Sequence, residues 1–168
     1  RNYETVTRPF IDGLGDRLKL WVDHHDHQRH ADWADDPRFV LVDRVDHPAC
    51  PELVTVERVA EAGPIDTIVC HTDFDGIVSA ARFLRGGIEL YPGCDADARA
   101  IDSKVGQPSA RAERIAGALA VRHDEAFRRL VLKSMLRGEE SPEVAALVDK
   151  AYTSYTKRVQ RGRALAHK

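Results

Sequence analysis

The 168-residue chain lacks several features that would point to a particular class of function. Its 3 cysteines form no CxxC pair, which argues against a disulfide framework and against a structural zinc site. Its net charge of −2 is too small to attract a polyanion through the field of the whole molecule. No apolar run reaches the roughly 20 residues of a membrane span. We therefore expect a cytoplasmic protein with no membrane partner.

The composition is that of an ordinary globular domain. Hydrophobic residues make up 43% of the chain and charged residues 31%, and a mass of 18.8 kDa is enough for one well-buried core. The sequence begins with Arg1 rather than Met and ends in a basic run after Val159. These ends predict a fragment of a larger protein.

Short apolar runs alternate with helical patterns along the first part of the chain. Runs typical of strands occupy 17–22, 38–43, 65–70 and, more weakly, 88–91. Helical patterns occupy 51–61, 76–85, 109–122, 124–136 and a last helix that Ser141 caps and Pro142 begins. This order predicts an α/β fold, a mostly parallel sheet flanked by helices with an all-helical C-terminal part. We expect an α/β metal-site region over 1–105, and a helical region over 106–168 that packs on it and leads to a further domain.

Histidine and aspartate are concentrated near the ends of two of these predicted strands. Asp23-His24-His25 closes one apolar run, and His71 to Gly76 (HTDFDG) closes another. Because the carboxyl ends of parallel strands meet at one edge of a sheet, both groups should project into the same crevice. Imidazole and carboxylate at high density are the ligands of Mn, Fe or Zn sites. A metal site is the expectation, and a solvated loop over 23–36 is the alternative.

The second group has a spacing that suits metal and phosphate. Residues two apart in an extended segment share a face, so His71, Asp73 and Asp75 should point the same way. Gly76 permits a tight entry into the next helix, whose first N–H groups would bind a phosphate oxygen. Two metal ions about 3.5–4 Å apart, bridged by a carboxylate, would explain so many acidic groups. One ion would lower the pKa of a bound water, so no Ser or Cys nucleophile is required.

The motifs WVDHH at 21–25 and HTDFDGIVSAA at 71–81 resemble the two most diagnostic motifs of the DHH phosphoesterase superfamily. That group includes RecJ-type exonucleases, nanoRNA and cyclic-dinucleotide phosphodiesterases, exopolyphosphatases and family II pyrophosphatases. The resemblance covers about 16 residues directly. It implies a hydrolase that uses Mn2+, with two ions and with Mg2+ or Co2+ as substitutes. Its substrate would be a phosphodiester or phosphoanhydride in a nucleotide, an oligonucleotide or polyphosphate, which metal-activated water would attack.

The same resemblance implies roles for individual residues. The metal ligands would be His71, Asp73, Asp75, His24 and a last carboxylate, for which Asp102 ranks ahead of Asp97 and Asp43. Asp23 and His25 would be the catalytic pair, which orients a ligand and contacts the phosphate. The substrate-binding residues would be Gly76, Ser79 and His47.

Two features depart from the family pattern. The HxDxDG-type motif normally precedes DHH, whereas here it follows by nearly 50 positions. The alternatives are a circular permutation and one part of a rearranged or duplicated protein. A further family carboxylate has no convincing counterpart before Asp23, and an incomplete ligand set would leave a domain that binds a nucleotide or phosphate without cleaving it. The expected partner is a phosphate-containing small molecule or short single-stranded nucleic acid, and a homo-oligomer is an open alternative.

Overall fold

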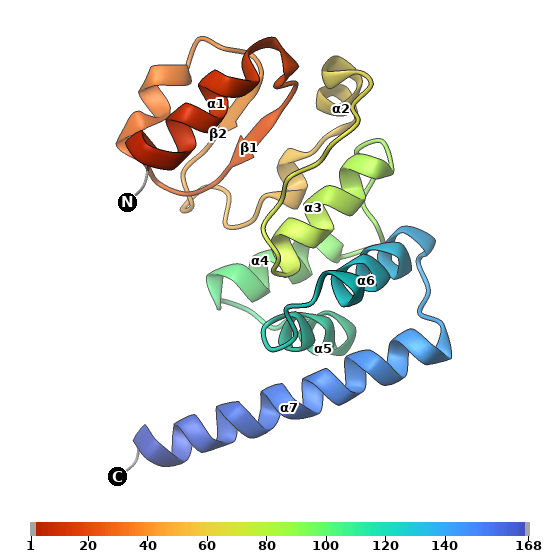
Figure 1. The fold of residues 1–168 in the computed structure, drawn as a ribbon. Helices are drawn as coiled ribbons and strands as arrows, with labels where there is room; N and C mark the ends of the chain where they lie inside the picture. Colours follow the sequence, from red (N-terminus) through yellow and green to blue (C-terminus); the bar gives the residue numbers. More distant parts are fainter. Residues whose placement is uncertain (1–2, 167–168) are drawn as a thin grey trace.

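The computed structural model describes residues 3–166, which fold mainly into helices (Figure 1). Helices account for 61% of the structure. Strand β1 (Trp21–Asp23) pairs in parallel with β2 (Phe39–Leu41), and Trp21 lies opposite Phe39. Within residues 3–166 the sheet contains only these two short strands. The predicted fold of a mostly parallel sheet flanked by helices is therefore wrong, and the chain is mostly helical.

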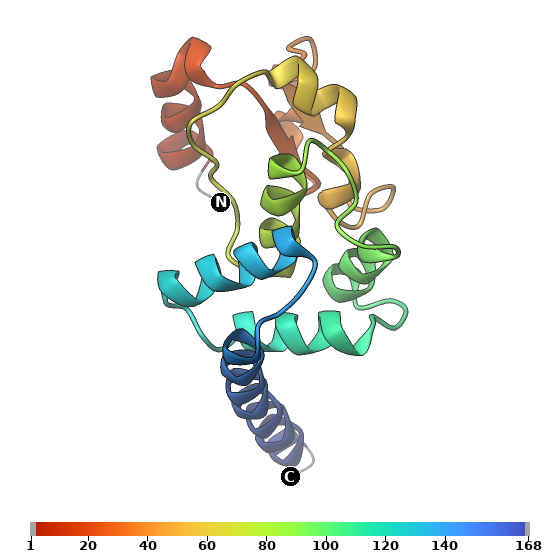
Figure 2. The same ribbon diagram turned by 90° about the vertical axis from the view of Figure 1, so that its right-hand side faces the viewer.

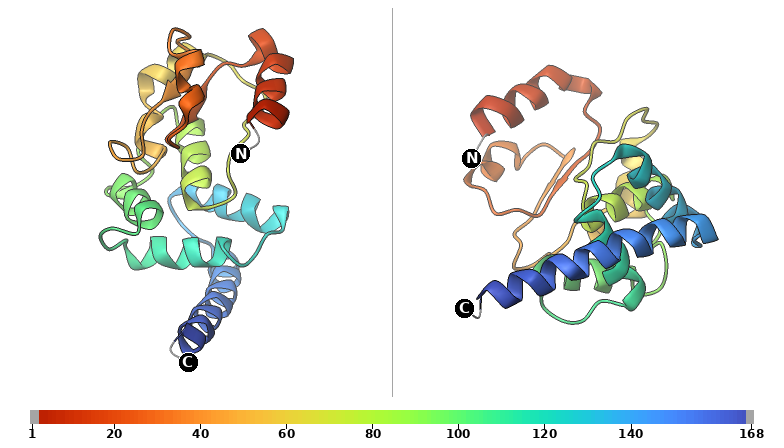
Figure 3. Two further views of the ribbon diagram at one scale, coloured as in Figure 1. Left: turned by 90° about the vertical axis from the view of Figure 1, so that its left-hand side faces the viewer. Right: turned by 60° about the horizontal axis from the view of Figure 1, so that its bottom comes forward.

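The N-terminal part combines the strand pair with short helical turns. These are a π-helical turn (Tyr3–Thr7), helix α1 (Arg8–Leu14) and 3₁₀ turns at Gly15–Arg17 and Gln28–Trp33. Stacked aromatic rings hold the part together, because Phe39 lies 4.6 Å from Trp33 and 6.1 Å from Trp21 between ring centroids. Figure 3 shows this part at one end of the molecule, and its left view places the C-terminus at the other end.

Six further helices follow the 3₁₀ turn Pro51–Leu53 within the described residues. They are α2 (Val56–Ala62), α3 (Phe74–Leu84), α4 (Cys94–Ser103), α5 (Ala110–Leu119), α6 (Glu125–Arg137) and α7 (Pro142–Ala166). The side-chain oxygen of Ser141 accepts a hydrogen bond from the Val144 N–H at 3.3 Å, so the predicted start of the last helix is confirmed. None of the described helices has the length and apolarity that crossing a membrane requires.

Helix α3 lies at the centre of the hydrophobic core. Its Phe74 and Val78 are 2% and 1% exposed and belong to one cluster with Phe127 of α6, Leu119 of α5 and Val148 of α7. The cluster runs from Ala49 to Ala151 and so crosses residue 105, where the sequence suggested a division. That division stays a prediction.

Two predicted strands do not form. Residues 65–70 and 88–91 have no strand partner, and Figure 2 shows the first of them descending from α2 to α3 (yellow) as an extended loop. A short apolar run becomes a strand only where a neighbour pairs with its N–H and C=O groups. Val69 is accordingly 76% exposed. Arg1 and the end of the basic run, His167 and Lys168, lie outside the described residues.

Candidate metal centre

His24 is the best-buried polar side chain of the molecule's described part, at 1% exposed. It follows β1 directly, so the paired strand fixes its backbone. Its ring Nδ1 lies 3.2 Å from the His47 carbonyl oxygen, which can only accept, so Nδ1 carries the proton and donates. The Nε2 lone pair is then turned to the other side, where the Asp102 carboxylate lies 3.9 Å away. This tautomer presents Nε2 as a metal ligand.

Asp75 comes to the same place from the first turn of α3. The residue is 6% exposed, and its Oδ1 accepts a hydrogen bond from the Cys50 N–H at 2.8 Å. Burial raises the pKa of Asp75, the Cys50 N–H and His24 lower it, and the Asp102 and Asp73 carboxylates raise it, so that it reaches about 6. A buried carboxylate in acidic surroundings is costly unless a cation joins it.

Cys50 is the third member of this group. One ring nitrogen of His24, the Cys50 sulfur and one Asp75 carboxylate oxygen all lie within 4.8 Å of one another. Burial, followed by the Asp75 and Asp23 carboxylates, raises the pKa of the Cys50 thiol. No role was assigned to Cys50 from the sequence, because the three cysteines form no CxxC pair.

Asp102 reaches the group from the last turn of α4, in contact with Arg44. The Arg44 guanidinium donates to Asp102, and this bond is the main cause of a raised pKa at Arg44. Asp97, the alternative carboxylate, accepts instead from the Tyr91 hydroxyl at 2.8 Å and from the Ser109 N–H at 2.6 Å. Of these two aspartates, Asp102 is therefore the one with an ion-pair distance to His24.

The predicted catalytic pair lies beside His24. Asp23 Oδ1 accepts from His25 Nδ1 at 2.8 Å and from the His25 N–H at 3.0 Å. The His25 ring is 4.6 Å from the His24 ring and 5.8 Å from that of His71, measured between centroids. His71 itself is exposed. The structure thus brings the DHH motif and the start of the second motif together at their histidines.

The other predicted residues have partners of their own. Asp73 is exposed and caps α3, where its Oδ1 accepts the Gly76 N–H at 3.0 Å, so this N–H is already used within the helix. The His47 Nδ1 lies 3.1 Å from Glu52 Oε1. The Ser79 hydroxyl is buried and has no hydrogen-bond partner in the described structure.

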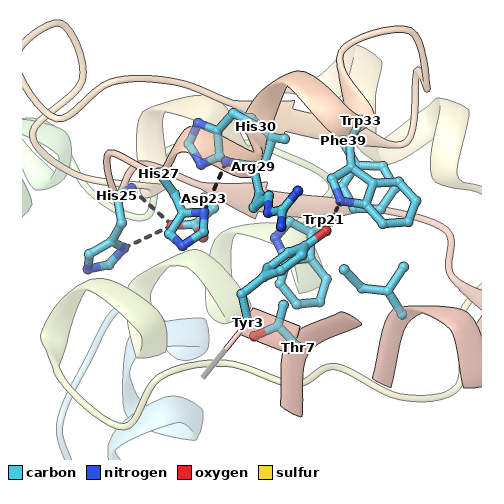
Figure 4. A pocket seen from close by; sticks show the side chains of 12 residues that line it. Tyr3, Thr7, Trp21, Asp23, His25, His27, Arg29, His30, Trp33 and Phe39 are labelled. Carbon is cyan, nitrogen blue, oxygen red and sulfur yellow. Dashed lines mark hydrogen bonds and ion pairs between the residues drawn. The ribbon is translucent and has the colours of Figure 1, made fainter. Parts of the chain in front are cut away.

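A hollow of about 690 Å³ lies against the acidic side of this group. Asp73, Asp75 and Asp102 line one part of it, and Lys104 and Arg163 also contribute to its wall. Asp23 and His25 line a smaller pocket of about 150 Å³ (Figure 4). Its aromatic rings pack on one another, and the Trp33 indole N–H donates to the Tyr3 hydroxyl at 2.7 Å. The larger hollow is therefore the one that Asp75 and Asp102 line.

The donors of His24, Cys50 and Asp75 suit a divalent metal ion. They provide one nitrogen, one sulfur and one carboxylate oxygen, two of them on residues less than a tenth exposed. Comparison with protein-family models, with curated proteins and with solved structures finds nothing that matches this chain. The assignment of the site therefore depends on the geometry of these residues.

Proposed function

We propose that the chain is a divalent-metal-dependent phosphoesterase of the DHH type, which hydrolyses a phosphodiester or phosphoanhydride in the cytoplasm. One observation carries the proposal. His24 from the first motif and Asp75 from the second are 51 positions apart in sequence, yet both are buried with metal-ligand atoms within 4.8 Å. Two short motifs that matched by accident would have no reason to meet in this way.

The residues around the proposed site would have different roles in hydrolysis. When bound, a divalent ion would lower the pKa of a water molecule and offset charge on the phosphoryl oxygens. Asp23 holds the His25 ring by its Nδ1 at 2.8 Å, which leaves Nε2 of an exposed imidazole to accept a proton or to hold a phosphoryl oxygen. Lys104 and Arg163, on the wall of the 690 Å³ hollow, supply positive charge for a substrate with further phosphates.

A second candidate is a domain that binds a nucleotide or phosphate without cleaving it. Two of the carboxylates expected to bind metal have other partners, since Arg44 donates to Asp102 and Asp73 caps α3. One three-donor group would then hold one ion rather than two, and hydrolysis of the two-metal type would be lost.

The deciding experiment is turnover with defined metal loading. The purified chain would be stripped with a chelator, loaded with Mn2+, Zn2+ or Co2+, and assayed on an aryl phosphodiester, pyrophosphate, a cyclic dinucleotide and a short oligonucleotide. We expect metal-dependent product, and a loss of more than about 100-fold in Asp75→Asn. Asp66→Asn is the matched control, because Asp66 is exposed in the loop before α3.

Three outcomes separate the candidates. Turnover that disappears in Asp75→Asn and persists in Asp66→Asn supports the phosphoesterase. Metal and nucleotide binding without turnover on any of the four substrates supports the binding domain. A chain that binds none of the three ions contradicts the phosphoesterase.

A further inference from the structure

Cys50 differs from the other two cysteines in what surrounds its sulfur. Cys94 is fully buried in the hydrophobic core, and Cys70 is exposed. Cys50 is half-buried and lies outside the hydrophobic core cluster, with metal-ligand atoms of His24 and Asp75 within 4.8 Å. A thiol that merely filled space would have apolar neighbours. The sulfur of Cys50 instead has a ring nitrogen of His24 and a carboxylate oxygen of Asp75 close to it.

The segment that carries Cys50 also fixes the other two donors. The His47 carbonyl accepts from Nδ1 of His24 at 3.2 Å, which turns Nε2 toward the Asp102 carboxylate. The Cys50 N–H donates to Oδ1 of Asp75 at 2.8 Å, which orients that carboxylate and leaves its second oxygen for another partner. Residues 47–50 thus position two donors through the backbone and contribute a third through a side chain. Backbone bonds of this kind hold metal ligands in place.

We propose that Cys50 is a ligand of the metal ion and that its sulfur makes this a site for Zn2+ rather than for Mn2+. Thiolate and imidazole together favour zinc, whereas carboxylate, carbonyl and water favour manganese and magnesium. One Cys, one His and one Asp are three protein ligands, and a three-ligand zinc site keeps a position for water or substrate. The inference deepens the proposed function and rests on its metal site, but it concerns the identity of the ion rather than hydrolysis.

Cobalt(II) provides a direct test, because it enters zinc sites and a sulfur ligand gives it a charge-transfer band in the near ultraviolet. The chelator-stripped chain, kept reduced with a phosphine, would be titrated with Co2+ and then with Zn2+. We expect the band in the wild type and in Cys70→Ser, the control that removes an exposed thiol. It should be absent from Cys50→Ser. Zn2+ should displace Co2+ and abolish the band, whereas equimolar Mn2+ should not.

A second variant keeps the test decisive if Cys50→Ser folds poorly, which circular dichroism would report. Cys50→Asp replaces sulfur by oxygen and should still bind metal, without the band. Its preference for Zn2+ over Mn2+, from competition titrations, should fall by more than about tenfold.

The outcomes separate this inference from the proposed function. Co2+ that binds the wild type without a near-ultraviolet band, or a band that survives in Cys50→Ser, overturns ligation by Cys50 and leaves the phosphoesterase proposal intact. The absence of any Co2+, Zn2+ or Mn2+ binding overturns both. The band together with inactivity on all phosphate substrates supports sulfur ligation and overturns hydrolysis alone.

Discussion

The two motif segments lie side by side but are held in different ways. Asp23-His24-His25 follows β1, whose backbone is paired with β2, and His24 is 1% exposed. The segment 71–75 follows a loop without strand pairing, and its His71 and Asp73 are exposed. Of the three predicted metal ligands in this segment, only Asp75, already inside α3, is buried, at 6% exposed. A motif residue is thus buried and fixed where paired backbone or a helix holds it, and not because it belongs to the motif.

The largest expected effect comes from removing the charge of Asp75. Burial holds its pKa at about 6, above the ordinary value of 3.8, so the folded chain binds this proton more tightly than the unfolded chain. The stability that protonated Asp75 contributes to the metal-free protein should therefore be fully present below pH 4 and be lost as the pH rises through 6. The loss attributable to Asp75 is on the order of 3 kcal/mol.

Asp75→Asn should both remove this pH-dependent loss of stability and abolish metal binding. The amide oxygen can still accept the Cys50 N–H, so the packing is preserved. With chelator present, the variant should unfold at higher urea concentration than the wild type at pH 8, and the difference should vanish near pH 4. Added metal should stabilise the wild type alone. A variant less stable than the wild type at pH 8 would show that protein groups already stabilise the Asp75 charge without metal.

The next prediction compares the loss of metal affinity after substitution of His24 and of His71. His24→Asn keeps an N–H near the position of Nδ1, for the His47 carbonyl, and removes Nε2. Its affinity for Co2+ or Zn2+, measured by competition with a chelator, should fall by about 100-fold. His71→Asn changes an exposed side chain in the unpaired segment and should change affinity by less than about threefold. Equal losses in the two variants would mean that the segment 71–73 closes onto the ion when metal binds.

The contact between the second motif segment and α3 can be broken at Gly76. A Cβ added at Gly76 would lie 2.3 Å from the His71 carbonyl oxygen, so the backbone at 71 would have to move. Gly76→Ala should therefore lower the free energy of unfolding by about 1–3 kcal/mol and weaken metal binding through Asp75. Gly162→Ala in α7 meets nothing within 4 Å and should stabilise the chain by at most about 1 kcal/mol. Urea unfolding of both variants measures the contrast, and a neutral Gly76→Ala would show that the 71–73 loop is free to shift.

Sequence reasoning predicted local features better than their arrangement. Capping residues and apolar periodicity predicted where two helices begin, at Ser141 and near Gly76. They also predicted the two short runs that became β1 and β2. Pairing partners are not encoded in a short run, so the strand predicted at 65–70 did not form. The grouping of His24 with Asp75 was expected from the motifs. Cys50 was missed because its neighbours come from chain segments about 25 residues away on either side.

The smallest expected effect tests whether the loop at 65–70 is unpaired in solution. Val69 is 76% exposed in this loop, whereas Val40 is 8% exposed in the middle of β2. Thr has nearly the shape and β-propensity of Val, so a Val→Thr change reports mainly the burial of a hydroxyl. Val40→Thr should lower the free energy of unfolding by about 1–3 kcal/mol, and Val69→Thr should change it by less than about 0.5 kcal/mol. Urea unfolding under identical conditions measures both. Equal losses would mean that 65–70 packs as a third strand against a partner, and the contrast between the two motif segments would then disappear.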